Sequence, residues 1–431
     1  MVRLHRDDIA AAIHADFGSR PHEETDMLEV FPSLSAIRHA LHHGKRWMKP
    51  KRGLASLAFL PASTELRPQP LGVVGIIVPW NYPLFLAVGP LVDALVAGNR
   101  AMVKMSEYTP RFSQLFAELV AHHFQPDEVI VVNGDASVGQ AFAELPFNHL
   151  LFTGSTAIGH QVMRAASAHL TPVTLELGGK SPALIGPGAR FENAVERIVF
   201  GKLVNAGQTC IAPDYVLLPR DDVARFASAA RDIAARLYPD FAHNTQYASI
   251  ATDRHYHRLI QLRDGAVHAG ARSEPLSDTQ DRAEQRLLTP VLLTGVHEDM
   301  PVMQQEIFGP LLPLVPYDTL DQAIDYVARH PRPLALYLFE QDQARIDHVL
   351  ARTHAGGVSL NDTLYHIAQH DLPFGGVGPS GIGGYHGEAG FRTFSHMKPV
   401  FRQARFNAAG LLNPPYGKRF RQLLEILLRR G

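Results

Sequence analysis

The sequence predicts an α/β protein whose two domains each alternate strands with helices. Residues 71–78 form a nearly continuous apolar run, which is typical of a strand buried on both faces of a parallel sheet. From this run to about residue 360, short apolar segments alternate with longer amphipathic ones through short connections, as in doubly wound folds. The length of 431 residues also exceeds what one ordinary hydrophobic core supports, so two or more domains are expected.

Composition excludes several classes of protein. The net charge is −1 at pH 7, so no overall basic field would attract nucleic acid or an anionic membrane. No uninterrupted apolar run reaches the roughly 18 residues that a spanning helix needs, and residues 1–8 lack the apolar core of a signal peptide. A single cysteine fits a reducing compartment, so a cytoplasmic protein is expected. The histidines show no spacing typical of a metal site, and no metal is expected.

Before the first buried strand, the pattern predicts two helices and an arm. Residues 5–18 and 33–47 mix polar and apolar residues with a helical period. Three prolines interrupt that period in residues 54–70, which predicts an extended arm or hairpin. The strands expected after the arm are 71–78, 101–104, 129–132, 149–153 and 172–177.

Turn and capping residues mark the helices between these strands. Pro83 is expected in the first turn of a helix that ends near Gly98. Thr109 is expected to cap the next helix, with Pro110 at its first position. Further helices are expected after Asp135 and from Ser155.

A second α/β alternation follows Gly178-Gly179 and carries the single cysteine. Residues 264–286 are its most polar part and are expected to form an exposed excursion. The glycine-rich residues 373–400 are expected to be irregular. The predicted strands lie near 183–185, 214–218, 289–293, 311–315, 334–339 and 356–360, and the predicted helices near 192–204, 221–237, 252–264, 319–329 and 341–353.

Cys210 is the only cysteine, at the end of the segment Gly207-Gln208-Thr209-Cys210. A lone cysteine cannot form an internal disulfide, and no CxxC pair offers a metal site. It is either a small buried hydrophobic residue, which is the usual role of a free cysteine, or a nucleophile. The residues around it must decide between the two.

Glu176 is a candidate partner for that thiol. Alternation along residues 173–177 places apolar side chains on one face of a strand and Glu176 on the other. The residue ends a predicted parallel strand, where α/β proteins bind ligands, and two glycines follow it. An ordinary carboxylate at an exposed strand end is the competing interpretation.

Asn81 lies between Pro79 and Pro83, directly after the first buried strand. A rigid turn would hold its amide as a donor, which is what the stabilisation of a developing oxyanion requires. An Asx turn or a helix cap ahead of Pro83 is the competing interpretation.

Three further segments are suited to a nucleotide. Residues 152–159 predict a strand, a glycine turn and a helix whose first N–H groups, near Ser155, suit a pyrophosphate, although the pattern is not GxGxxG. Lys104 and Glu107 follow an earlier strand and are suited to a ribose, or else form a solvated ion pair. Glu306 and Phe308 are suited to a ribose and a ring, or else are a surface carboxylate and an aromatic core residue.

Seven segments together resemble the NAD(P)-dependent aldehyde dehydrogenase superfamily, across about residues 71–400. Residues 206–215 and 384–396 resemble its class 3 branch, and residues 15–18 with the helix through Trp47 are most similar to the bacterial coniferyl aldehyde dehydrogenases. The seven segments are Pro79-Trp80-Asn81-Tyr82-Pro83, Lys104-Met105-Ser106-Glu107, Phe152-Thr153-Gly154-Ser155, Glu176-Leu177-Gly178-Gly179-Lys180-Ser181-Pro182, Gly207-Gln208-Thr209-Cys210, Glu306-Ile307-Phe308-Gly309-Pro310 and Pro373-Phe374-Gly375-Gly376.

Two departures from the branch are visible. Met105 stands where the branch usually has proline, and the chain starts closer to its first helix than relatives do, so part of an N-terminal helix is expected to be missing. Both are expected to affect packing more than chemistry.

The resemblance implies a mechanism. The Cys210 thiolate would attack an aldehyde carbon, while Asn81 and the Cys210 backbone N–H hold the oxyanion. Glu176 would activate water as general base, a role that has also been considered for the residue at Glu306 in class 3 relatives. NAD is the implied cofactor, with NADP possible. The implied cofactor contacts are Trp80, Lys104, Glu107, Gly154, Ser155, Glu306 and Phe308, and the implied residues of the substrate tunnel are Tyr82 and His386.

The resemblance also implies an aldehyde dehydrogenase-like fold, with a Rossmann-type domain, an α/β catalytic domain and a small oligomerisation β-arm. The resemblance further implies a homodimer or a higher homo-oligomer. Residues 418–430 are expected to form an amphipathic helix that docks on the protein or its dimer mate; a membrane-surface anchor is the less favoured alternative. The expected domains are 1–50 with 71–178 for the dinucleotide, 179–370 for catalysis, 51–70 with 390–405 for the arm, and 406–431 for the tail.

The expected activity is the oxidation of a hydrophobic aldehyde, aromatic or aliphatic and with coniferyl aldehyde among the candidates, to the carboxylic acid. A fatty aldehyde dehydrogenase, a non-catalytic binding or structural member of the family, and an acyl-phosphate or acyl-CoA reductase are the alternatives. The presence of Cys210, Glu176, Asn81 and Glu306 argues against the non-catalytic member. Glu176 argues against the reductase, because hydrolysing a thioester needs a base that activates water.

Overall fold

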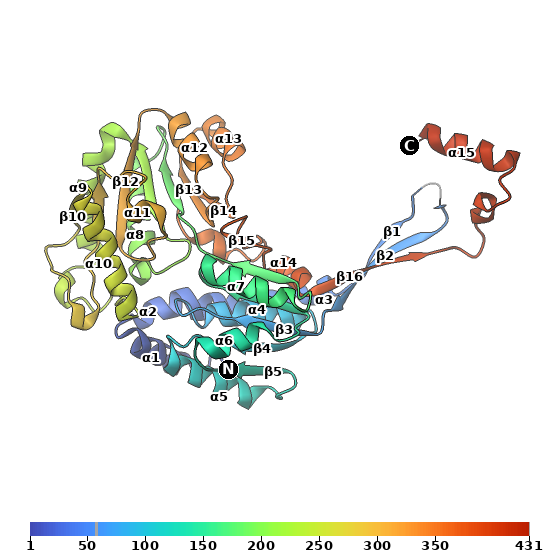
Figure 1. Ribbon diagram of the computed structural model, residues 1–431, viewed down its shortest axis with the longest axis horizontal. Helices are drawn as coiled ribbons and strands as arrows, with labels where there is room; N and C mark the ends of the chain where they lie inside the picture. Colours follow the sequence, from blue (N-terminus) through green and yellow to red (C-terminus); the bar gives the residue numbers. More distant parts are fainter. Residues whose placement is uncertain (57–58, 431) are drawn as a thin grey trace.

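The computed structural model describes residues 1–56 and 59–430, so residues 57 and 58 of the predicted arm and residue 431 of the predicted tail lie outside it. Within this part of the chain the strands form a first sheet of six strands, a second sheet of seven and an arm sheet of three. Figure 1 shows the first and second sheets in the body of the molecule, with the arm sheet projecting from it. The predicted α/β class with a β-arm is confirmed.

The first sheet is a layer between two sets of helices. Val74, Ile76 and Val103 belong to the same core as helices α4 and α5, whereas Phe152 and Leu175 pack with α6 and α7. Successive side chains of a strand point to opposite faces, so a strand covered on both faces is apolar at nearly every position. Its strands, in spatial order, are β15 (Gly381–Ile382), β7 (Val173–Glu176), β6 (His149–Thr153), β3 (Val73–Ile77), β4 (Arg100–Lys104) and β5 (Val129–Val132).

These strands are parallel except for β15, which runs antiparallel to β7. The helices that follow them lie over the sheet (Figure 1), and three α-helices and the π-helical segment Asp26–Val30 precede β3 in the chain. The helices of this part are α1 (Arg6–Phe17), α2 (His22–Thr25), α3 (Phe31–Trp47), α4 (Phe85–Val96), α5 (Pro110–His123), α6 (Ala136–Ala143), α7 (Thr156–Ser167) and α14 (Gly387–Thr393).

The second sheet is parallel except for its edge strand β10. Its strands, in spatial order, are β10 (Arg272–Pro275), β11 (Val291–Thr294), β12 (Leu311–Tyr317), β9 (Tyr215–Pro219), β8 (Pro182–Ile185), β13 (Ala335–Phe339) and β14 (Gly357–Leu360). Its helices are α8 (Phe191–Leu203), α9 (Val223–Leu237), α10 (Asp253–His268), α11 (Pro301–Gln304), α12 (Leu320–Arg329) and α13 (Gln343–Arg352).

The arm sheet is antiparallel and consists of β1 (Lys51–Leu54), β2 (Ser63–Pro70) and β16 (Ser395–Arg402). The predicted helix of the tail is present as α15 (Lys418–Arg430), which stands away from the body beyond the arm (Figure 1). None of the helices that the structure describes is long and apolar enough to cross a membrane.

Residues 264–286, predicted as an exposed excursion, are mostly exposed or half-buried, and they also contain the end of α10 and strand β10, whose Ser273 pairs with Leu293 of β11. An edge strand has a partner on one side only and tolerates polar residues, so polarity did not exclude a strand here. The prediction that residues 373–400 are irregular was wrong. Residues 373–400 contain α14, β15 and most of β16, because the glycines there admit close backbone approach without excluding regular pairing.

The start of α4 differs from the prediction. The helix begins at Phe85 rather than in the turn at Pro83. The Glu29 carboxylate accepts hydrogen bonds from the backbone N–H groups of Leu84 and Phe85, at 2.7 and 3.2 Å. A residue far away in the chain therefore caps this helix, and no local pattern could have indicated it.

The cap of α5 also differs. The helix begins at Pro110 as predicted, but the Thr109 side chain makes no capping hydrogen bond. Asp16 supplies the acceptor instead, for the N–H groups of Arg111 and Phe112 at 3.0 and 2.9 Å. A carboxylate satisfies these N–H groups and complements the helix dipole, so the threonine is not needed for that purpose.

Candidate active site

A cavity of about 260 Å³ lies at the carboxyl ends of β3, β6 and β7, facing the loop that carries Cys210. Its wall is formed by strand ends and loops of the first sheet, by the loops that carry Cys210 and Glu306, and by α10. This is the position at which parallel α/β sheets bind ligands. The lining residues are Pro79, Trp80, Asn81, Leu86, Thr153, Gly154, Ser155, Glu176, Leu177, Gly178, Cys210, His255, Arg258, Glu306 and Phe308.

The Cys210 loop has an unusual backbone. Asn205, Ala206 and Gly207 have φ angles of 51°, 50° and 74°, in the left-handed region. A Cβ on Gly207 would lie 2.5 Å from the carbonyl oxygen of Gly309, so this position requires glycine. Across the described residues, the Cys210 N–H has no oxygen acceptor, so it is available to a bound group.

The environment of the Cys210 thiol favours its neutral form. Burial raises the pKa of the thiol, and the carboxyls of Glu306 and Glu176 raise it further, while the backbone N–H groups of Cys210 and Ile211 act in the opposite direction. The thiol therefore keeps its proton at pH 7 in this state. Formation of the thiolate, which is the nucleophile, requires that a nearby group accept that proton.

Asn81 is buried, and its side-chain Nδ2 donates a hydrogen bond to the carbonyl oxygen of Gln208 at 3.2 Å. An amide nitrogen has two hydrogens, so one N–H remains for the cavity that Asn81 and Cys210 both line. The interpretation of Asn81 as a helix cap is not supported, because α4 takes its cap from Glu29.

Glu176 is the last residue of β7 and is 2% exposed, so the interpretation as a carboxylate at an exposed strand end is wrong. Neither of its carboxyl oxygens has a hydrogen-bond partner among the residues described. Burial raises its pKa well above the usual range. A buried carboxyl without partners holds a proton readily and, when ionised, binds water strongly.

Glu306 is a second carboxyl at the same cavity. A Cβ on Gly178 would lie 2.1 Å from Glu306 Oε2, so the missing side chain of Gly178 makes room for this carboxyl. Oε1 has no hydrogen-bond partner in the described part of the chain. Burial and the charge of Asp214 raise the pKa of Glu306 to about 8, although Lys180 and Arg258 oppose this.

Aromatic rings form one wall of the cavity. Trp80 stacks on His255 with a centroid distance of 4.9 Å, and Phe308 meets Trp80 edge-on at 5.5 Å. His255 and Arg258, both on α10, were not among the predicted site residues. Their spacing of three places them on one helix face, but nothing distinguished that face from an ordinary polar surface.

Lys104 and Glu107 lie outside this cavity. Lys104 is buried at the end of β4, and its Nζ donates to the carbonyl oxygens of Met105 and Gly134 at 2.7 and 2.8 Å. Burial lowers the pKa of Lys104, which the charge of Glu107 opposes. The interpretation as a solvated Lys/Glu pair is therefore wrong for the lysine, while Glu107 is exposed.

Tyr82 and His386 also lie outside this cavity. The Tyr82 hydroxyl is hydrogen-bonded to the Thr209 hydroxyl at 2.6 Å, behind the Cys210 loop. His386 is buried and stacks on Phe374 with a centroid distance of 5.6 Å. It lines a separate cavity of about 10 Å³ with residues that include Asp93.

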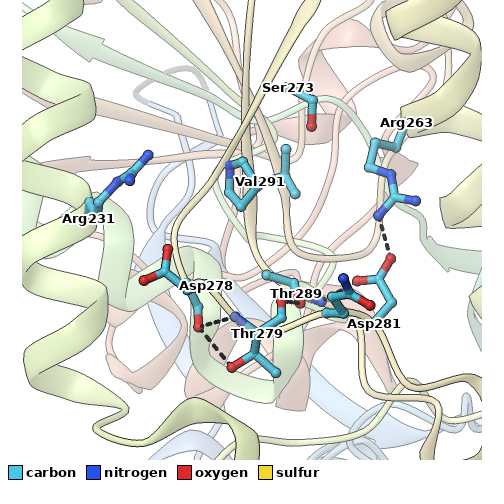
Figure 2. Close-up of a pocket in the computed structure, with 11 residues that line it drawn as sticks. Arg231, Arg263, Ser273, Asp278, Thr279, Asp281, Thr289 and Val291 are labelled. Carbon is cyan, nitrogen blue, oxygen red and sulfur yellow. Dashed lines mark hydrogen bonds and ion pairs between the residues drawn. The ribbon is translucent and has the colours of Figure 1, made fainter.

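A larger depression, of about 500 Å³, lies elsewhere, against α9, α10 and the segment between β10 and β11. Figure 2 shows polar side chains around it, with an ion pair between Arg263 and Asp281. None of the predicted site residues lines it. The candidate catalytic residues therefore lie at the cavity of about 260 Å³ and not at this larger depression.

Comparison with known proteins identifies relatives of the whole chain. Residues 1–400 match the aldehyde dehydrogenase family. The chain is 53% identical to a probable coniferyl aldehyde dehydrogenase of Pseudomonas aeruginosa, over 97% of this chain and 87% of that one. It is 44% identical to the coniferyl aldehyde dehydrogenase of a Pseudomonas species, over 99% and 89%. The substrate-bound structure of AldH from Staphylococcus aureus superposes with a TM-score of 0.93 at 36% identity, covering 99% of this chain and 92% of that one.

Proposed function

The chain belongs to the aldehyde dehydrogenase family, and from that premise we propose that it oxidises an aromatic aldehyde to the acid with Cys210 as nucleophile. Members of this family oxidise aldehydes with NAD(P)+ through a catalytic cysteine. The observation that carries the assignment of residues is that Cys210, Asn81 and Glu176 line one cavity. Coniferyl aldehyde is the first candidate substrate, because relatives at 53% and 44% identity carry that name.

In this proposal Cys210 gives its proton to the Glu176 carboxylate, which passes it to solvent, and the thiolate attacks the aldehyde carbon. The bond between sulfur and carbon forms while the carbonyl oxygen becomes an oxyanion. The remaining N–H of Asn81 and the Cys210 backbone N–H hold that oxygen, which is supported by their lack of other acceptors among the described residues. Each such donor is typically worth about 3 kcal/mol.

Glu176 is proposed as the general base of hydrolysis. Bound NAD(P)+ would supply the hydride acceptor, and loss of hydride from the thiohemiacetal would leave Cys210 as an acyl thioester. Glu176 takes a proton from water, the hydroxide attacks the thioester carbon, and the thiolate leaves. The unpartnered, buried carboxyl of Glu176 supports this role, since its raised pKa brings it nearer to neutral pH.

Two observations support the binding of a dinucleotide by the residues of this cavity. The N-terminus of α7, at Gly154 and Ser155, lines the cavity, and Glu306 Oε1 is unpartnered there within the described residues. We assign the pyrophosphate to the former and a ribose hydroxyl to the latter, with Trp80 and Phe308 packing nearby. For the adenosine ribose we assign Lys104 and Glu107. We propose NAD rather than NADP as the cofactor, because the Glu107 carboxylate at the adenosine ribose would repel a 2′-phosphate.

The other predictions remain proposals. The first sheet would bind the dinucleotide and the second would carry catalysis, within the expected domain limits. The arm sheet would join two copies of the chain into a dimer, which its exposed Leu54 and Phe401 support. The cytoplasm is the proposed compartment, supported by the single cysteine.

A substrate panel tests the proposal. The purified enzyme is mixed with NAD+ or NADP+ and with coniferyl aldehyde, benzaldehyde or hexanal, and NADH or NADPH is followed by absorbance. We expect the highest kcat/KM with an aromatic aldehyde and NAD+, and no turnover in Cys210→Ser. Preference for hexanal would favour the fatty aldehyde alternative, and turnover in Cys210→Ser would refute the assigned nucleophile.

A further inference from the structure

We propose that Arg20, Glu24 and Glu29 position the two loops that form the oxyanion site. We call these three residues the N-terminal clamp. They lie between α1 and α3, are 0%, 8% and 0% exposed, and do not line the cavity. The inference rests on the role proposed above for Asn81.

Arg20 holds the turn that carries Asn81. Its Nη1 donates a hydrogen bond to the Asn81 carbonyl oxygen at 3.2 Å and lies 2.7 Å from Glu29 Oε1. The guanidinium also lies 5.0 Å from the ring centroids of Tyr82 and of Phe17. Stacking and hydrogen bonding from a rigid planar group leave the Asn81 backbone little freedom.

Glu29 holds the same turn at its other end. Its second oxygen, Oε2, accepts from the N–H groups of Leu84 and Phe85, where α4 begins. The ion pair of Arg20 and Glu29 therefore ties the carbonyl of Asn81 to the first turn of α4. A single buried unit fixes both ends of the turn.

Glu24 holds the Cys210 loop. Its carboxylate accepts from the Asn205 backbone N–H, with the nearer oxygen at 3.2 Å. The Asn205 side-chain amide donates to the carbonyl oxygens of both Asn81 and Gln208, each at 3.2 Å. Because the amide of Asn81 donates to the same Gln208 carbonyl, the clamp couples the donor's turn to the nucleophile's loop.

A purely stabilising role accounts poorly for this arrangement. Arg20 Nε and Nη2 have no hydrogen-bond partner among the described residues, and a buried ion pair with unpaired donors is a weak source of stability. Burial also raises the pKa of Glu24 to about 7, against the charge of Arg20. The geometry instead favours a role in positioning Asn81 and the Cys210 loop, since a misplacement of about 1 Å in a catalytic group costs roughly 100-fold in rate.

The test is a double-mutant cycle on the full-length enzyme. Arg20→Met and Glu29→Gln are each made in the wild type and in Asn81→Ala, and kcat and both KM values are measured. In the wild-type background we expect kcat to fall by at least about 10-fold, with KM for NAD+ within about twofold. In Asn81→Ala we expect each further loss of kcat to be below about twofold, because the amide that the clamp positions is gone.

Controls separate positioning from stability. Arg263→Met removes the partly buried pair with Asp281 outside the cavity and should lower the melting temperature without changing kcat. Arg20→Lys keeps the charge without the planar fork and should give an intermediate kcat. If Arg20→Met does not fold, Glu24→Ala, which removes the acceptor for the Asn205 N–H, is tested in the same double-mutant cycle.

The outcomes are distinguishable. A folded Arg20→Met with wild-type kcat, or a loss of equal size in both backgrounds, would overturn the clamp while Asn81 keeps its role. Wild-type kcat in Asn81→Ala alone would overturn the proposed oxyanion role, and the clamp with it. Loss confined to the melting temperature would show that the three residues only stabilise the fold.

Discussion

Replacing Asn81 with alanine removes a side-chain donor that lines the same cavity as Cys210. The substitution deletes both N–H groups of the amide, of which one is bound to the Gln208 carbonyl. That carbonyl keeps the hydrogen bond from Asn205, so it is not left without a partner. The structural damage is thus limited to about one neutral hydrogen bond, about 1 kcal/mol of stability.

The catalytic loss should be larger than the structural one. An oxyanion donor contributes about 3 kcal/mol to the transition state, which corresponds to roughly 100-fold in the rate of the acylation half-reaction. The donor acts on the oxyanion and not on the bound aldehyde, so kcat should fall while KM for NAD+ stays near that of the wild type.

Rapid mixing separates the two half-reactions. A wild-type enzyme limited by hydrolysis shows a burst of NADH, and Asn81→Ala should lose this burst because acylation becomes rate-limiting. A deuterated aldehyde should then slow the steady state of the variant more than that of the wild type. The reasoning fails if Asn81→Ala keeps its burst amplitude and a kcat within about twofold of the wild type.

Three more predictions concern the charged groups. Glu306→Gln removes a charge that raises the pKa of Cys210, so alkylation of the thiol should start at lower pH; a shift to higher pH would contradict this. Burial raises the pKa of Glu176, so its stabilising contribution is complete below pH of about 4.5 and is lost as pH rises through the folded-state value. Glu176→Gln should therefore melt at a higher temperature than the wild type at pH of about 8 and at a similar temperature at pH of about 4; equal differences at both pH values would argue against a buried, unpartnered carboxyl. Glu107→Ser should raise kcat/KM with NADP+ relative to NAD+, and an unchanged ratio would remove Glu107 from the ribose site.

The sequence predicted a residue's position correctly where that position depends on its neighbours in the chain. The apolar run 71–78 predicted a strand covered on both faces, and β3 is such a strand. Glu176 ends a buried strand and Asn81 follows one, so their position at the sheet edge was predictable from local signals, whereas their meeting with the Cys210 thiol was expected from the family resemblance. Ser155 was correctly placed at the start of α7, where its side chain accepts from Ile158 N–H.

Residues that act on a distant segment could not be predicted. Glu29 caps a helix that begins 56 residues later in the chain, and Asp16 caps one about 95 residues later. Arg20 reaches Asn81 across 61 residues. These partners depend on tertiary packing, and a single sequence contains no pattern that links them. Tyr82 illustrates the converse, because its motif was recognised but its hydroxyl is bound to Thr209 outside the cavity.

The central claim is that Cys210 carries the acyl group that Glu176 helps to release. The most direct test is to incubate Glu176→Gln with NAD+ and coniferyl aldehyde and to measure the mass of the intact protein and of its peptides. The account predicts one equivalent of acyl adduct on the peptide containing Cys210, released by hydroxylamine and absent from Cys210→Ser. Steady turnover at the wild-type rate without adduct, or an adduct on another residue, would contradict it.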